Sequence, residues 1–178
     1  LDNVSMNGWT EGPMVVYHDG FYYMTYTGNH VLCKAYRINY AVSDSSPVSY
    51  SQGNNNPLLV NTSDDIYGIG HSSTVKGPDL DSYYIVYHSL VNTVPNRSTN
   101  IDRIFFNGTD MKILGPNTYE QQAPSLPDVY SYFREGYTLE GWTLYGSQDD
   151  SSALTLSAGS MLVSDYRFSG NYTAEYNV

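Results

Sequence analysis

The sequence is poor in basic residues and cysteine, and it has no long apolar run. Lys and Arg number 8 against 18 Asp and Glu, which gives a formal net charge of −10. Such an excess of negative charge repels a phosphate backbone, so we expect no nucleic-acid partner. The single cysteine, Cys33, excludes a disulfide within the chain and is expected to be a small buried side chain. No apolar run approaches the roughly 18 residues that cross a bilayer, so we expect no membrane span.

Helical periodicity is also lacking, whereas tyrosine is abundant. The chain holds 19 Tyr against 5 Phe and 2 Trp. Aromatic and β-branched residues suit a half-buried pleated surface, which predicts an all-β protein. The dipeptides Asp19-Gly20 and Asn107-Gly108 each separate two apolar runs and predict tight hairpins. The predicted strands cover residues 13–17, 21–27, 36–42, 58–60, 83–88, 101–106 and 111–114.

A weak internal repeat suggests how these strands are grouped. Residues 22–26 (YYMTY) align with residues 83–87 (YYIVY) at an offset of 61 residues. Four-strand units repeated at such an interval predict a β-propeller with extended connections. The first strand of a propeller blade lines the central axis. Glu11 and His71, each ahead of a repeated strand, are therefore expected to approach the same central cavity.

The character of the sequence changes after Pro127. Residues 128–178 combine a linker with short strand-like segments that are punctuated by Gly, Ser and Asp, as at the beginning of a β-sandwich. These strands are too few to close two sheets around a core. We therefore expect two domains, residues 1–127 and residues 128–178, both parts of a longer polypeptide.

Three sequence blocks, in order, resemble glycoside hydrolase family 43, the five-bladed propeller arabinofuranosidases, xylosidases and arabinanases. The first is Glu11-Gly12-Pro13 with the strand at residues 19–26. The second is residues 68–73 (GIGHSS) with YIVYH behind it, and the third is residues 97–103 (RSTNIDR). The resemblance spans about residues 8–127 and implies about the last two of five blades. The segment from Gly141 to Gly146 is similar to the start of the concanavalin-like sandwich that often follows such propellers.

The resemblance implies an inverting glycosidase in which Glu11 is the general acid. His71 would lie on the propeller axis, bind beneath the sugar and hold a calcium ion or an ordered water network. Arg97 would contact substrate hydroxyl groups. The general base and the Asp that tunes Glu11 come from earlier blades in the family, so the partner of this chain is the remainder of the same polypeptide. The fragment alone is expected to be inactive. The implied substrates are arabinofuranosyl or β-xylosyl linkages in plant-type polysaccharide.

Each of these residues also has a structural interpretation. Glu11 could be a solvated loop acid and His71 a structural histidine. Arg97 could be a surface residue within the sequon of Asn96, where a glycan would crowd the cavity mouth. His88 is expected to pack or to form a hydrogen bond locally. The four histidines lack zinc-site spacing.

Five N-glycosylation sequons favour a secreted glycoprotein. They begin at Asn3, Asn61, Asn96, Asn107 and Asn171. An alternative to the enzyme is therefore a non-catalytic extracellular propeller that binds glycans or serves as a structural glycoprotein, because a fold does not fix a function.

Overall fold

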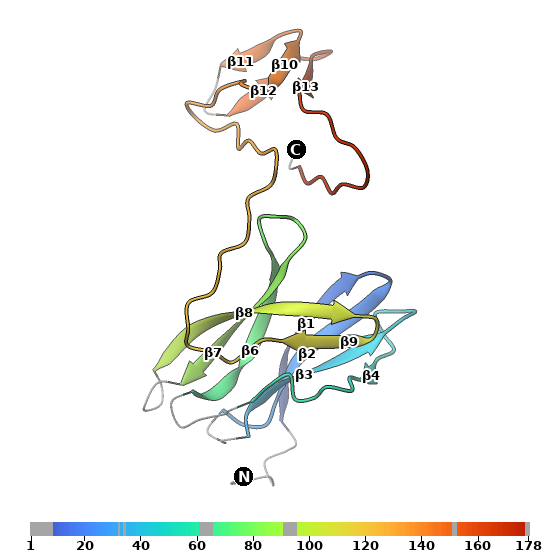
Figure 1. The fold of residues 1–178 in the computed structure, drawn as a ribbon, viewed down its shortest axis with the longest axis vertical. Coiled ribbons are helices and arrows are strands. Elements are labelled where there is room, and N and C mark those ends of the chain that lie inside the picture. The colour runs from blue at the N-terminus through green and yellow to red at the C-terminus, as the bar shows by residue number, and fades with distance from the viewer. Residues whose placement is uncertain are drawn as a thin grey trace. The chain divides into compact units, whose positions relative to one another are not determined.

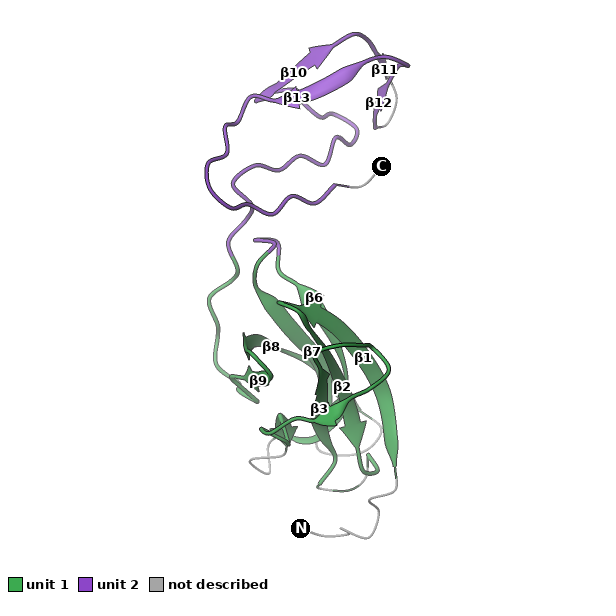
Figure 2. Cartoon of the chain, turned by 90° about the vertical axis from the view of Figure 1, so that its right-hand side faces the viewer, with its two compact units in different colours: residues 1–77, 81–124 green, residues 78–80, 125–178 purple. Residues whose placement is uncertain are grey.

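The computed structural model describes residues 9–31, 33, 35–60, 66–90, 96–150 and 153–176. The chain divides into two compact units, shown in green and purple in Figure 2. Unit 1 holds residues 1–77 and 81–124, and unit 2 holds residues 78–80 and 125–178. The regular structure of the described residues is entirely β-strand (Figure 1), which confirms the all-β prediction. Among these residues, no helix is long and apolar enough to cross a membrane.

Unit 1 consists of two antiparallel sheets, each built from strands that follow one another in the chain (Figure 1). The strands are β1 (Thr10–His18), β2 (Phe21–Gly28), β3 (Arg37–Ser43), β4 (Ser51–Gln52), β5 (Leu59–Val60), β6 (Tyr67–Lys76), β7 (Tyr83–Leu90), β8 (Arg97–Asn107) and β9 (Asp110–Ile113). The first sheet has the order β1-β2-β3-β4, with β5 paired to β3, and the second has the order β6-β7-β8-β9. Such four-stranded meanders are the building blocks of propellers.

Both predicted hairpin turns are present. Asp19 and Gly20 have φ angles of 45° and 89° between β1 and β2, and two positive φ angles define a type I′ turn. Gly108 has a φ of 59° and opens the two-residue turn that joins β8 to β9. Each turn matches the right-handed twist of its strands, so local sequence sets the register of both hairpins.

The predicted repeat corresponds to β2 and β7, the second strands of the two sheets. Both strands have the same alternation of buried and half-buried residues, so that the buried Tyr23 and Thr25 correspond to Ile85 and Tyr87. Equivalent positions lie 62 residues apart, so the predicted offset of 61 is wrong by one. Because neighbouring side chains of a strand face opposite ways, an offset of 61 would match the buried Tyr23 with the half-buried Tyr84.

The two sheets of unit 1 share one apolar core. Its members come from both sheets and include Tyr23, Ile38, Tyr40, Leu59, Ile69, Ile85, Tyr87, Ile104 and Met111. Several of them are entirely buried, and burial of a large apolar side chain contributes about 2 kcal/mol. This core fixes β6 against the first sheet, and that contact builds the site described below.

Two tyrosines of the first sheet also bind the β8–β9 turn of the second sheet through main-chain atoms. Tyr23 donates its hydroxyl proton to the carbonyl oxygen of Gly108, and Tyr40 donates to that of Thr109 at 3.4 Å. Both tyrosines are buried, with exposed fractions of 1% and 0%. We call this pair of hydroxyl-to-carbonyl contacts the hairpin clasp.

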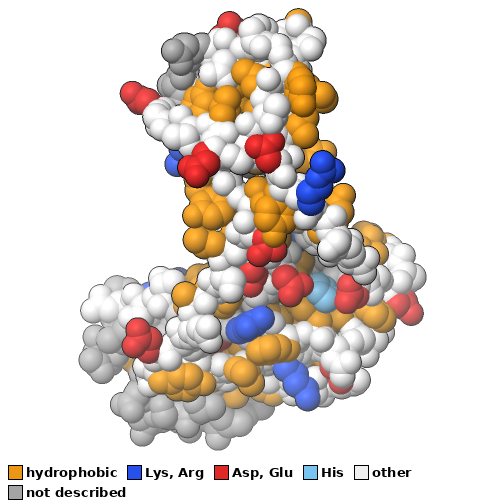
Figure 3. Space-filling view, turned by 45° about the horizontal axis from the view of Figure 1, so that its top comes forward, with side chains coloured by type: hydrophobic (Ala, Val, Ile, Leu, Met, Phe, Trp, Pro, Cys, Tyr) orange, Lys and Arg blue, Asp and Glu red, His pale blue; other side chains and the backbone are white. Residues whose placement is uncertain are grey.

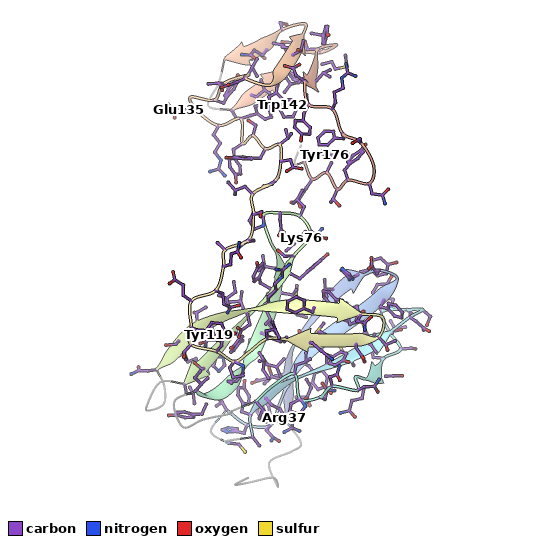
Figure 4. The ribbon with its side chains drawn as sticks, in the orientation of Figure 1. Arg37, Lys76, Tyr119, Glu135, Trp142 and Tyr176 are labelled. Atoms are coloured by element: carbon purple, nitrogen blue, oxygen red, sulfur yellow. The ribbon has the colours of Figure 1, made fainter. Side chains whose placement is uncertain are left out.

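Unit 2 contains two small antiparallel sheets. Its strands are β10 (Trp142–Tyr145), β11 (Gln148–Asp150), β12 (Leu154–Leu156) and β13 (Met161–Ser164). Strand β10 pairs with β13, and β11 pairs with β12. The ring of Trp142, labelled in Figure 4, meets that of Phe133 edge to face at a centroid distance of 5.2 Å. None of the described residues of this unit is buried, and hydrophobic side chains reach its surface in Figure 3. The β-sandwich remains a prediction.

Candidate active site

Glu11 lies near the start of β1, immediately before an irregularity in the strand. It pairs with Thr27 of β2, and the register then shifts before Met14. Gly12 has a φ of 59°, which favours glycine, and Pro13 lacks the N–H that a regular ladder uses. The Gly-Pro pair therefore forms a bulge, a feature that changes the direction in which a neighbouring side chain points.

Two aromatic side chains donate hydrogen bonds to the Glu11 carboxylate. The hydroxyl group of Tyr36 lies 2.7 Å from Oε1, and the indole of Trp9 is the second donor. The bond from Tyr36 is the largest cause that holds the pKa of Glu11 below its ordinary value, followed by the bond from Trp9. The charges of His71 and Arg97 act in the same direction, whereas partial burial opposes them. A general acid that works near neutral pH needs a raised pKa, so the described surroundings of Glu11 alone do not provide that condition.

His71 lies beside the Gly12 bulge. A Cβ atom on Gly12 would stand 3.4 Å from the imidazole ring, so the ring covers this glycine. The backbone N–H of His71 donates to Oγ1 of Thr27 at 2.7 Å, and its φ of 51° marks a local departure from regular strand geometry. The side chain is exposed. Strands β1, β2 and β6 thus bring His71 next to the residue that follows Glu11, as the repeat had suggested.

Arg97 is the first residue of β8, and its side chain is exposed. Its charge lowers the pKa of Glu11, as described, and also that of His88. It therefore lies close enough to both groups to act on them electrostatically. The three residues singled out in the sequence are Glu11, His71 and Arg97, and they come from β1, β6 and β8.

Sequence reasoning missed three contributors to this site, namely Trp9, Tyr36 and His88. The ring of His88 lies 5.8 Å from that of Tyr36, and its Nε2 atom is buried without a hydrogen-bond partner among the described residues. Burial, followed by the charges of Arg97 and His71, lowers the pKa of His88 to about 4. The ring is therefore neutral at physiological pH. Trp9 had one signal, its place two residues before Glu11, but nothing marked Tyr36 among 19 tyrosines.

Glu11 also borders a hollow of about 540 Å³ on the first sheet. Met24 and Tyr26 of β2 line it, together with Tyr50 and Gln52 near β4. Met24 and Tyr26 are half-buried, on the opposite face of β2 from the buried Tyr23. The hollow therefore extends from Glu11 across the outward face of this sheet.

The described residues do not form a calcium site by themselves. Calcium takes six to eight oxygen ligands, whereas His71 offers a nitrogen. In the described part of the chain, no three His, Cys, Asp or Glu side chains are grouped so that they could hold a metal ion. Calcium near His71 therefore remains a prediction.

The sequons divide by their place in the structure. Asn96, Asn107 and Asn171 are exposed, as an acceptor must be. Asn3 and Asn61 lie outside the described residues. Occupancy of all five remains a prediction.

Comparison with known proteins assigns the chain to a class of enzymes. Residues 3–110 match the family model for glycosyl hydrolases family 43, so the chain belongs to that family. The β-D-galactofuranosidase xynD of Aspergillus niger is 33% identical over 109 residues, which cover 58% of this chain and 31% of that protein. This chain thus spans about a third of the length of its curated relative.

Solved structures agree with this assignment. A thermostable family-43 glycoside hydrolase has a TM-score of 0.58 and 37% identity, over 66% of this chain and 39% of its own. The endo-1,4-β-xylanase of Bacteroides thetaiotaomicron VPI-5482 has a TM-score of 0.54 and 26% identity, over 61% of this chain and 38% of its own. The two sheets of unit 1 therefore belong to the β-propeller of a polysaccharide-degrading family.

Proposed function

We propose that unit 1 supplies the general acid, Glu11, of an inverting glycoside hydrolase. The observation that carries the proposal is the convergence on one carboxylate of the Tyr36 hydroxyl at 2.7 Å and the charges of His71 and Arg97. These groups come from β6, from β8 and from the residue that precedes β3, and they meet beside a bulge. Simple strand packing does not require such a convergence.

In the proposed reaction, protonated Glu11 gives its proton to the glycosidic oxygen as the bond between that oxygen and the anomeric carbon breaks. Water attacks the anomeric carbon from the opposite face while a second carboxylate takes a proton from it. In inverting enzymes the two carboxyl groups lie roughly 6.5 to 9.5 Å apart. No second carboxylate is among the described groups that shift the pKa of Glu11. We therefore assign the base to the remainder of the polypeptide, and we expect this fragment to be inactive alone.

The lowered pKa of Glu11 also supports a site that is completed by groups from the remainder of the polypeptide. A general acid must be protonated at the working pH, and a nearby like charge raises the pKa of a carboxyl group. We assign this second negative charge to a tuning Asp in the remainder of the polypeptide. Arg97 and His71 would bind sugar hydroxyl groups and stabilise the Glu11 carboxylate after proton transfer. Any calcium near His71 would need oxygen ligands from outside the described residues.

The proposed substrates are furanosyl or xylosyl linkages in a polysaccharide or an oligosaccharide. Arabinofuranosyl and β-xylosyl groups are the substrates that the sequence blocks imply. The Aspergillus niger relative is a β-D-galactofuranosidase, so galactofuranosides belong among the compounds to be tested. Secretion is part of the proposal, because extracellular polysaccharide is the substrate. Residues 1–127 would contribute about the last two of five blades, and residues 128–178 the first strands of a β-sandwich.

The test is Glu11→Gln in the full-length protein. The rate on an unactivated oligosaccharide should fall about 10²- to 10⁴-fold, because no proton reaches the leaving group. A 2,4-dinitrophenyl glycoside needs no protonation, so its hydrolysis should change little. The matched control is Glu135→Gln, an exposed acid of unit 2 (Figure 4), which should leave both rates unchanged. Full activity of Glu11→Gln on the oligosaccharide would refute the assignment.

One observation favours a second function, a glycan-binding propeller without hydrolysis. The lowered pKa keeps Glu11 ionised at neutral pH, and a carboxylate accepts hydrogen bonds from sugar hydroxyl groups. If the full-length protein binds arabinoxylan or galactofuranan in calorimetry but releases no reducing sugar, this second function replaces the first.

A further inference from the structure

Tyr36 is the most enclosed aromatic side chain near Glu11. It directly precedes β3, and 1% of its surface is exposed. Its ring packs on Gly70 of β6, where an added Cβ would overlap the ring and lie 2.7 Å from Cγ2 of Thr27. The ring of His88 is also close to the Tyr36 ring and is inclined to it by 31°. Residues of β2, β6 and β7 therefore hold the Tyr36 ring in place, and its hydroxyl group points to Glu11 of β1.

This enclosure gives the Tyr36 hydroxyl group one defined position. The hydroxyl donates to Oε1 of Glu11 at 2.7 Å. Burial and the neighbouring Glu11 carboxylate raise the pKa of Tyr36, so its hydroxyl group keeps its proton. Trp9, the second donor to this carboxylate, is 54% exposed, so Tyr36 is the enclosed donor of the two. An enclosed donor at Oε1 favours Oε2 as the oxygen that carries a proton.

We propose that Tyr36 is a positioning residue for the general acid: it holds Oε1 of Glu11, so that the catalytic proton is carried on Oε2. This inference rests on the proposed function of Glu11. In the reaction, the Oε2–H bond breaks as the glycosidic oxygen takes the proton and the electron pair of its broken bond to carbon. The Tyr36 proton stays on Tyr36. Its hydrogen bond strengthens as Oε1 gains negative charge, because charge-assisted bonds are the stronger ones.

The charged and titratable groups around Glu11 set the sign of the expected pH effect. His71 of β6 and Arg97 of β8 act on Glu11 electrostatically, and the ring of the neutral His88 of β7 lies 5.8 Å from that of Tyr36. Removal of the Tyr36 hydroxyl leaves these groups in place and takes away a donor that favours the ionised carboxylate. The pKa of Glu11 then rises. Because the acid works in its protonated form, activity should persist to higher pH.

The experiment is Tyr36→Phe in the full-length protein, which keeps the ring on Gly70 and removes one oxygen. The kcat on an unactivated oligosaccharide should fall about tenfold, and that on a 2,4-dinitrophenyl glycoside less than twofold. The alkaline limb of the kcat/KM profile should move up by about one pH unit, the effect of one charge-assisted hydrogen bond. The hydroxyl group of 3-fluorotyrosine is a stronger donor, so Tyr36→3-fluorotyrosine should move the alkaline limb to lower pH. This second variant tests the proposal even if the Phe variant does not fold.

The matched control is Tyr40→Phe, another buried tyrosine, whose hydroxyl binds Thr109 instead. It should lower stability without moving the limb. The proposal would be overturned if kcat fell equally on both substrates and the alkaline limb of the kcat/KM profile stayed in place in the Phe and fluorotyrosine variants. Tyr36 would then be a packing residue. The two hypotheses fail separately. If Glu11→Gln keeps full activity, the proposed function fails, whereas a loss in Glu11→Gln without a limb shift at Tyr36 overturns this inference alone.

Discussion

Arg97 has two interpretations, a surface arginine or a residue that binds the sugar. Its side chain is exposed and follows a sequon asparagine, as in a surface arginine. Yet its charge reaches Glu11, Tyr36 and His88. A guanidinium group has five donors in a fixed plane and suits the hydroxyl groups of a sugar.

We therefore predict that Arg97→Ala in the full-length protein raises KM for an oligosaccharide at least about tenfold, as expected for the loss of charge-assisted hydrogen bonds to the substrate. Steady-state kinetics on the unactivated substrate measures this effect. The control is Arg103→Ala, an exposed arginine of the same strand that lies over the ring of Phe105 at 5.3 Å. If both variants resemble the unmodified protein, Arg97 is a surface residue.

Two residues of the site, Glu11 and His71, could be predicted from the order of the strands in the sequence. Glu11 and His71 lie ahead of repeated strands, and strand order alone carries both toward one edge of the sheets. Tyr36 could not be predicted, because its role depends on a glycine that is 34 positions away, at Gly70. Its ring occupies the space that the missing side chain leaves. Such complementarity depends on tertiary packing and leaves no local pattern.

At the scale of the strands, β6 was the main element missed. Gly68 and Gly70 weaken a strand on their own, and the register of β6 against β7 shifts twice. Added Cβ atoms at these glycines would overlap Leu90 and Tyr36, respectively. The two glycines therefore allow these neighbouring side chains to pack directly against the backbone of β6. Strands marked by alternating aromatic and β-branched residues, such as β2 and β7, were predicted because their signal is local.

Strand β8 carries a buried acid, Asp102, that anchors the chain beyond β9. It is 1% exposed and accepts hydrogen bonds from Tyr87 at 2.6 Å, from Gln121 at 3.0 Å and from Asn117. Burial raises the pKa of Asp102, whereas these three donors oppose that rise. Gly115 leaves the space that the carboxylate fills. The segment after β9, on which Tyr119 lies (Figure 4), is thus held to unit 1.

We predict that Asp102→Ala lowers the free energy of unfolding by about 3 kcal/mol, because it leaves the buried Tyr87 hydroxyl without an acceptor and breaks charge-assisted bonds. Urea denaturation followed by tyrosine fluorescence measures this loss. Asp110→Ala is the control, since its Oδ1 atom is buried without a partner among the described residues, and it should cost less than about 1 kcal/mol. Similar losses in the two variants would contradict the anchoring role.

At the scale of the whole molecule, the two units differ in how much of their surface they bury. Unit 1 contains every buried residue of the described chain, whereas the described part of unit 2 has none. Many of its large apolar side chains are accordingly exposed, among them Tyr132 at 73% and Tyr172 at 68%. Two-stranded sheets without a core are marginally stable in water.

We predict that residues 125–178, expressed alone, show no cooperative thermal transition and exchange their amide protons at nearly the rates of an unfolded chain. Circular dichroism and hydrogen exchange give these readings. The same residues within the full-length protein should be protected, if the predicted β-sandwich supplies the missing partners. A sharp melting transition of the isolated segment would show that it has a core of its own.

The hairpin clasp has a consequence for how this propeller tolerates mutation. Tyr23 and Tyr40 bind carbonyl oxygens at Gly108 and Thr109, and every amino acid provides that same atom. Sequence drift in the turn therefore leaves the acceptors intact, whereas drift at either tyrosine removes a donor. Within the clasp, the constraint on residue identity therefore falls on the two tyrosines of the first sheet, whereas the apolar core that joins the sheets constrains residues of both.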